Sequence, residues 1–137
     1  MSELDMLREM LAYWLPVLRL SDWKVDLRSV SMADLDGAIA RNTTYLSNKS
    51  CLLLVSRLDS RTTSRQYDLE EDLVHEIVHL HFDTLSRFAD MPDGGALEKI
   101  ALEQPVEALS VALVGLRRQS GHRWSWERKT KRGKSKA

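Results

Sequence analysis

Residues 73–82, LVHEIVHLHF, combine an apolar helical pattern with side chains that are costly to bury. This segment holds three of the chain's four histidines and one glutamate among leucine, isoleucine, valine and phenylalanine. Its apolar side must pack against other elements, and its polar side chains must find partners in the same fold. A single helix cannot meet both demands, so the segment requires a domain built around it.

The neighbouring residues predict a helix with a defined start and end. Asp68, followed three residues later by Glu71, resembles a capping box. Apolar residues then recur at helical spacing at Leu69, Leu73, Ile77, Leu80 and Leu85. The sequence DMPDGG, residues 90–95, is expected to stop this helix after about four to five turns.

Within the predicted helix, His75 and His79 are four residues apart and lie on one face, about 40° from each other. Both imidazoles can therefore bind the same Zn²⁺. Glu76 is rotated by about 100° from His75, where it can reach a water on the metal without binding the metal itself. This His-Glu-x-x-His pattern is typical of a zinc hydrolase helix, with Glu76 as the general base. His81 points about 200° away from His79, and we expect a structural role for it.

A catalytic zinc site with an open position needs a third protein ligand. Only one histidine, His122, follows this helix, so we expect a carboxylate from the last predicted helix. The candidates are Glu98, Glu103 and Glu107. Glu103 and Glu107 share one helical face, so one can bind the metal while the other orients a ligand histidine. This division favours Glu103 as the ligand and Glu107 as its support, and Glu98 remains the alternative.

The N-terminal half predicts one helix followed by three strands. Ser2 can cap a first helix, which Pro16 is expected to bend or end. Residues 23–28 alternate apolar and polar side chains, as a half-buried strand does. Residues 38–46 and 50–55 predict two further strands that are joined as a hairpin through SNK.

The last helix is predicted from near Ala96 to Arg118, with Pro105 as a kink or as its true start. Its expected core stripe consists of Leu102, Val106, Leu109, Leu113 and Leu116. The predicted order is therefore α-βββ-α-α. It is typical of an α+β domain in which helices pack on one face of a small sheet.

Charge divides the chain into two parts. The 137 residues have a net charge of zero. Their number and their 43% hydrophobic content are enough for one domain with a modest core. Residues 1–116 carry 11 Lys and Arg against 19 Asp and Glu, whereas residues 117–137 carry 9 against one. We therefore expect a domain at residues 1–118 and a basic, flexible tail at residues 119–137. Removal of that tail should leave the domain folded.

The tail has three interpretations. It can be a solvated extension, or it can contact nucleic acid through phosphate binding and base stacking. The residues suited to nucleic acid are Arg123, Trp124, Trp126, Arg128, Lys129, Lys131 and Arg132. Alternatively, Trp124 and Trp126 fold back on the domain as ordinary core.

Cysteine usage and apolar runs bear on the cellular setting. Cys51 is the only cysteine, which excludes an intrachain disulfide and a cysteine metal cluster. A reducing, cytoplasmic setting fits best. No stretch resembles a signal peptide or is long enough to cross a bilayer, so we expect no membrane partner.

The segment HEIVH, followed by LEQPVEAL at residues 102–109, resembles the gluzincin branch of zinc metallopeptidases. The element order, with LSDWKVDL ahead of the hairpin, is similar to small phage-borne metallopeptidase-like and minigluzincin proteins. The resemblance covers about residues 4–116. It implies a minimal zincin-like domain in which the zinc ligands are His75, His79 and Glu103 and the general base is Glu76. Pro105 departs from this pattern, and no residue matches the His or Tyr that larger members use to stabilise the oxyanion.

The function that this implies is zinc-dependent hydrolysis of peptide bonds, with Glu76 activating the attacking water and a peptide or protein as substrate. It also implies a phage-encoded protein that acts in the host cytoplasm. An extended substrate would add to the strand at residues 38–46 or to the one at residues 50–55. The alternative is a catalytically quiet zinc-binding module that binds nucleic acid or a host protein in a regulatory or anti-defence role.

Overall fold

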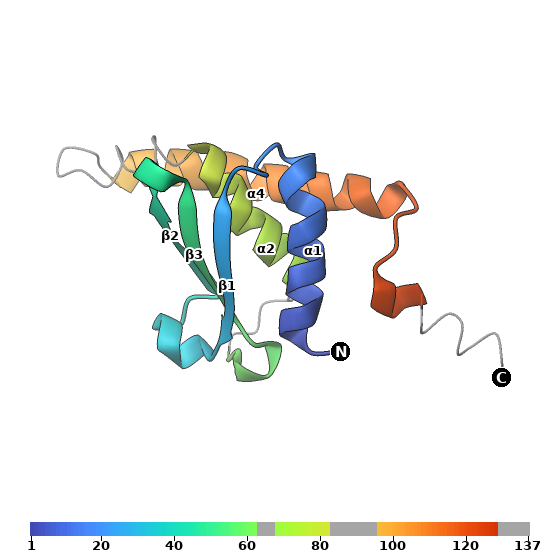
Figure 1. Cartoon of the computed structure of the whole chain (residues 1–137). Coiled ribbons are helices and arrows are strands. Elements are labelled where there is room, and N and C mark those ends of the chain that lie inside the picture. The colour runs from blue at the N-terminus through green and yellow to red at the C-terminus, as the bar shows by residue number, and fades with distance from the viewer. Residues whose placement is uncertain (63–67, 83–95, 129–137) are drawn as a thin grey trace.

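The computed structural model describes residues 1–62, 68–82 and 96–128, and for residues 96–100 the backbone alone. The chain forms a mixed α+β domain in the predicted α-βββ-α-α order (Figure 1). The main elements are α1 (Glu3–Val17), β1 (Lys24–Val30), β2 (Ala40–Tyr45), β3 (Ser50–Ser56), α2 (Leu69–Val78) and α4 (Ala96–Gln119). None of the helices in these described ranges is long and apolar enough to cross a membrane.

The three strands form one mixed sheet in the order β1-β3-β2. β2 pairs antiparallel with β3, which confirms the predicted hairpin. β1 pairs with β3 in parallel and occupies its other edge, an arrangement that the strand patterns did not predict. The central strand is therefore the apolar SCLLLVS, whose Cys51, Leu53 and Val55 are buried.

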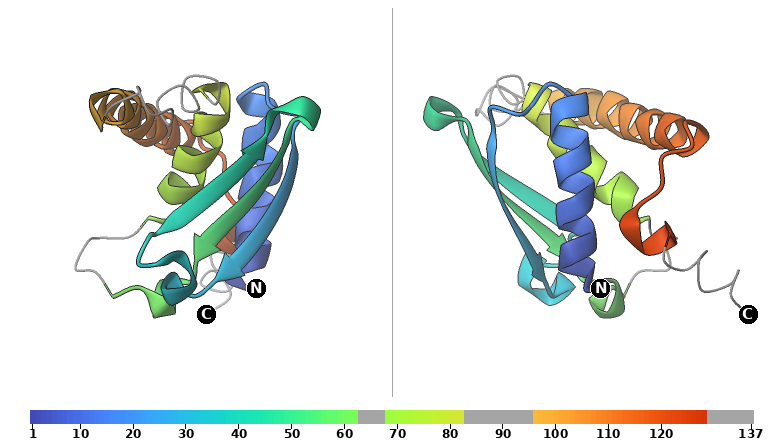
Figure 2. Two further views of the ribbon diagram at one scale, coloured as in Figure 1. Left: turned by 90° about the vertical axis from the view of Figure 1, so that its left-hand side faces the viewer. Right: turned by 45° about the vertical axis from the view of Figure 1, so that its right-hand side comes forward.

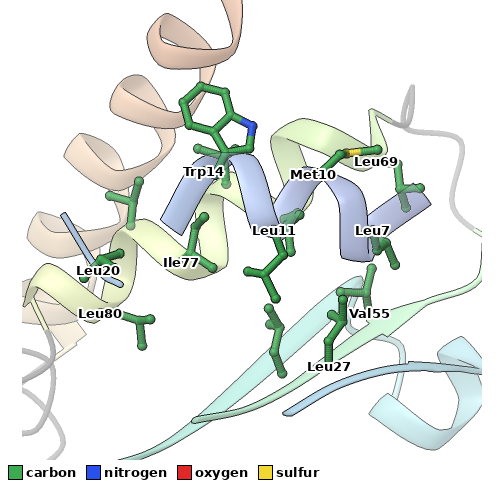
Figure 3. Packing of buried hydrophobic residues seen from close by; sticks show 14 of the residues in the cluster. Leu7, Met10, Leu11, Trp14, Leu20, Leu27, Val55, Leu69, Ile77 and Leu80 are labelled. Atoms are coloured by element: carbon green, nitrogen blue, oxygen red, sulfur yellow. The ribbon is translucent and has the colours of Figure 1, made fainter. Parts of the chain in front are cut away.

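Helices α1 and α2 lie on one face of this sheet (Figure 2). The packing between them is apolar, with Leu7, Leu11 and Trp14 from α1 meeting Ile77 from α2 and Val55 from the sheet (Figure 3). At the start of α1, the Ser2 hydroxyl accepts a hydrogen bond from the Asp5 backbone N–H at 3.1 Å, which confirms the predicted cap. The helix ends at Val17, one residue after Pro16.

Helix α2 begins as predicted and ends earlier than predicted. The Asp68 carboxylate accepts a hydrogen bond from the Glu71 backbone N–H at 3.1 Å. The α-helix stops at Val78, and a tighter 3-10 turn follows at His79–Phe82. In this turn the exposed His81 ring lies 2.7 Å from the carbonyl oxygen of Leu18, just after α1. This contact agrees with a structural role for His81. Leu85 lies outside the described residues.

Helix α4 is continuous through Pro105, but its buried face differs from the predicted stripe. Among the α4 side chains that the structure describes, the buried ones are Val106, which belongs to the predicted stripe, and Ser110, Val114 and Arg117, at spacings of four, four and three residues. Leu109 and Leu116 are 42% and 62% exposed. The buried face of α4 therefore runs through Arg117, which has a partner inside the domain, and leaves Leu109 and Leu116 exposed.

That partner is Glu70, which lies in the first turn of α2. Arg117 donates two hydrogen bonds to the Glu70 carboxylate, one of them from Nε at 2.9 Å, and the Trp14 indole donates a third at 3.0 Å. The Arg117 and Glu70 side chains are only 3% and 4% exposed. A buried carboxylate is tolerated when it is paired and hydrogen-bonded in this way. The network ties α1, α2 and α4 together at one point.

The described part of the C-terminal segment is not a free tail. Trp124 is 3% exposed and belongs to the core, and the Arg117 guanidinium lies 4.8 Å from the centre of its ring. The backbone N–H of Ser125 donates to the Glu9 carboxylate of α1 at 2.8 Å, and residues 125–128 form a helical turn. The described residues after 118 therefore pack on the domain as far as Trp126, and residues 129–137 of the expected tail lie outside the described residues. For Trp124, the alternative of folding back on the domain is confirmed.

Candidate metal centre

Three side chains that the sequence nominated as metal ligands converge between α2 and α4. The ligand atoms of His75, His79 and Glu103 all lie within 4.8 Å of one another. Glu103 Oε1 is 2.8 Å from His79 Nε2, and Glu103 Oε2 is 3.1 Å from His75 Nε2. The two imidazole Nε2 atoms are 3.3 Å apart.

Helix geometry explains how this convergence arises. His79 is the first residue past α2, yet its backbone N–H still bonds to the carbonyl of His75, so the two rings stay one turn apart on the same face. On α4, Val106 is fully buried. Glu103 lies three residues before Val106, and Glu107 lies one residue after it. The two carboxylates therefore flank this buried residue.

His75 is engaged through both of its ring nitrogens. Its Nδ1 is 2.9 Å from Glu107 Oε2. A proton on Nδ1 donated to this carboxylate leaves the lone pair of Nε2 directed at Glu103 and His79. This is the arrangement that holds a metal-binding imidazole in one tautomer and one orientation.

The donor set suits a divalent cation. Two imidazole nitrogens and a carboxylate oxygen match the ligand chemistry of Zn²⁺, although imidazole also suits other transition metals. Burial lowers the pKa of His79, an effect that the charge of Glu103 opposes. A neutral imidazole is the form that binds a metal. Glu103 is 54% exposed, so the site is accessible from solvent.

Glu76 lines the same cavity as His75 and Glu103. The residue as a whole is only partly buried, but its carboxylate is enclosed enough that burial raises its pKa to about 7. The charge of Glu103 acts in the same direction, while His75 and a hydrogen bond from Asn42 oppose it. Asn42 Nδ2 donates to Glu76 Oε2 at 2.6 Å, a contact that no sequence pattern had indicated.

A cavity of about 270 Å³ opens beside the histidines. It is lined by Ile39, Ala40, Glu71, Asp72, His75, Glu76, Glu103 and Glu107. Asp72 is held by the fully buried Arg61, whose Nη1 is 2.6 Å from Asp72 Oδ2. The cavity is therefore bordered by the start of β2 and by both site helices.

The other residues predicted to have a role lie away from this site or outside the described part of the chain. The side chain of Glu98 is not among the described ones, and neither are Lys129, Lys131 and Arg132. Arg123 and Arg128 are exposed and follow the C-terminal end of α4, whereas Glu103 lies in the N-terminal half of that helix. Trp124 and Trp126 stack on each other with ring centres 5.6 Å apart, and the buried Trp124 has no free face for a base.

Comparisons with known proteins add no family assignment. No protein-family model, no curated protein and no solved structure matches the chain.

Proposed function

We propose that this chain is a metal-dependent hydrolase with a zincin-like site, in which Zn²⁺ is the metal and a peptide bond is the target. One observation carries the proposal: His75, His79 and Glu103 converge from two helices on one solvent-accessible point. Glu76 lines the cavity beside them. A site that only stabilised the fold would not need this additional carboxylate.

Each site residue has a role in this proposal. His75, His79 and Glu103 hold the cation, and Glu107 keeps His75 oriented through Nδ1. When bound, Zn²⁺ polarises a carbonyl group and lowers the pKa of a coordinated water toward about 7. Glu76 takes up the proton of the attacking water and returns it to the leaving amine.

The sheet supports one mode of substrate binding. β3 is paired on both sides, so it cannot accept a further strand. β2 pairs only with β3 among the described residues, and Ile39 and Ala40 at its start line the cavity. Of the two strands considered from the sequence, β2 is therefore the one to which an extended peptide can add its backbone hydrogen bonds.

The decisive experiment combines metal analysis with a hydrolysis assay. We expect about one zinc per full-length chain, and cleavage within a quenched-fluorescent peptide library. Glu76→Gln should retain the zinc and lose hydrolysis, because it removes a proton acceptor and not a ligand. A chain that binds no transition metal after zinc is supplied at neutral pH would refute the metal site. Zinc loss in Glu76→Gln equal to that in His75→Ala would refute the role given to Glu76.

The alternative of a catalytically quiet zinc-binding module stays open to the same test. It predicts bound zinc without hydrolysis. For a module that binds nucleic acid, Arg123 and Arg128 are exposed and can contact phosphates. Trp124 is buried and cannot stack on a base. Titration of single- and double-stranded DNA at two salt concentrations would detect such binding, since phosphate contacts weaken steeply with salt.

A further inference from the structure

Asn42 lies in the middle of the edge strand β2, opposite Leu53 of β3. Residues directly opposite each other in an antiparallel pair present their side chains on the same face. Leu53 is fully buried, so Asn42 faces the helices. Its amide nitrogen donates to two oxygens of one residue, the Glu76 carboxylate at 2.6 Å and the Glu76 backbone carbonyl at 3.2 Å.

Both contacts fix Glu76, but they do different things. The α-helix ends at Val78 and a 3-10 turn follows, so the Glu76 carbonyl belongs to the last turn of the α-helix. Asn42 supplies a partner for that carbonyl. The shorter contact engages only one carboxylate oxygen, Oε2, and leaves Oε1 outside this hydrogen bond. A neutral amide restricts the rotamer of the carboxylate without adding a compensating charge.

We propose that Asn42 is a positioning residue, which holds the Glu76 carboxylate at the cavity and couples it to the edge strand β2. The inference rests on the proposed hydrolytic function. If Asn42 served only to complete the end of α2, its bond to the backbone carbonyl would suffice. The second bond, to the side chain, connects the strand that can bind substrate with the group that moves the proton.

The kinetic test uses a substitution that keeps the shape of the side chain. Asn42→Asp retains the size of asparagine, loses both N–H donors and adds a charge, whereas Asn42→Ala loses the donors without adding a charge, so an effect common to both variants reports the lost donors. We expect Asn42→Asp and Asn42→Ala each to lower kcat by about 10–100-fold with KM and zinc affinity close to those of the wild type, since misplacing a reacting group costs this much. Asn48→Asp, the same substitution at an exposed residue of the turn after β2, is the matched control and should behave as the wild type. Wild-type kcat in Asn42→Asp would overturn the proposal.

A second readout does not depend on hydrolysis. In the metal-free, full-length protein, the side-chain amide protons of Asn42 should show an NMR shift typical of a bond to a carboxylate. The missing signals in Asn42→Asp identify them. Glu76→Ala should move these protons, whereas Glu71→Ala, at another carboxylate of the cavity, should not. If the wild-type chain hydrolyses nothing, the proposed function fails while this measurement still judges Asn42. Signals unmoved by Glu76→Ala would refute the contact.

Discussion

His75 makes contacts through both ring nitrogens, and two carboxylates of α4, those of Glu103 and Glu107, divide these contacts between them. Glu107 meets Nδ1 at 2.9 Å, while Glu103 meets Nε2 of His75 at 3.1 Å and that of His79 at 2.8 Å. Of the two, Glu103 contacts both histidines. The same helical turn can therefore offer a ligand and a group that orients a ligand, because the two glutamates are four residues apart.

This division predicts an order of effects on metal binding. Glu103→Ala should weaken zinc affinity most, because it removes a ligand. Glu107→Ala should weaken it by about 10–100-fold, as the loss of an orienting partner does. Glu98→Ala should have the smallest effect. Competition with a zinc chelator measures all three, and a largest loss in Glu98→Ala would assign the ligand to that residue instead.

At the scale of elements, the helices are held in register by polar contacts as well as by apolar packing. Glu70 lies one and a half turns before His75 on α2 and binds Arg117 of α4 and Trp14 of α1. Arg61, before α2, binds Asp72 in the same way. The Glu70–Arg117 pair joins α2 to α4, the two helices that carry the histidines and Glu103, whereas the Arg61–Asp72 pair joins α2 to the segment after β3.

Removing one partner of the Glu70–Arg117 pair should be strongly destabilising. Glu70→Ala leaves a buried, unpaired guanidinium, and we expect a loss of about 3–5 kcal/mol in the free energy of unfolding. Denaturant unfolding followed by circular dichroism measures this loss. Asp26→Ala, which breaks the exposed Arg28–Asp26 pair, is the control and should remain close to the wild type. Equal stability of the two variants would contradict the assigned role of the buried pair.

At the scale of the whole molecule, the chain closes on itself. The segment after α4 returns to α1, where Ser125 bonds to Glu9 and the His122 ring stacks on Tyr13 with ring centres 4.4 Å apart. Trp124 completes the core between them. The basic C-terminal region is thus anchored to the acidic remainder of the chain through its first ten residues.

Shortening the chain should therefore unfold part of it, contrary to the expectation from sequence. Trp124→Ala should cost about 3–5 kcal/mol of stability, as large-to-small substitutions of buried aromatic residues do. Deletion of residues 120–137 should cost at least as much. Arg123→Ala, the exposed neighbour of Trp124, should change stability little. If the chain without residues 120–137 had the melting temperature of the wild type, the C-terminal segment would be dispensable for folding.

Local patterns in the sequence determined the elements and the core of the candidate site. The period of apolar residues and the capping signals at Ser2 and Asp68 depend only on neighbours, and both caps form as predicted. The spacing of His75 and His79 is likewise a property of any helix. Glu103 could be nominated because a helix with two histidines lacks a third ligand, and the tertiary structure brings its carboxylate to them.

The tertiary structure alone decided the features that join distant parts of the chain. The parallel pairing of β1 with β3, the rotation of α4 toward Arg117 and the return of Trp124 to the core leave no periodic signal. Asn42 and Glu76 are 34 residues apart, and Ser125 and Glu9 are 116 apart. Such contacts depend on how several elements pack at once. The local sequence of a strand or a tail does not indicate whether a polar residue in it has a hydrogen-bond partner.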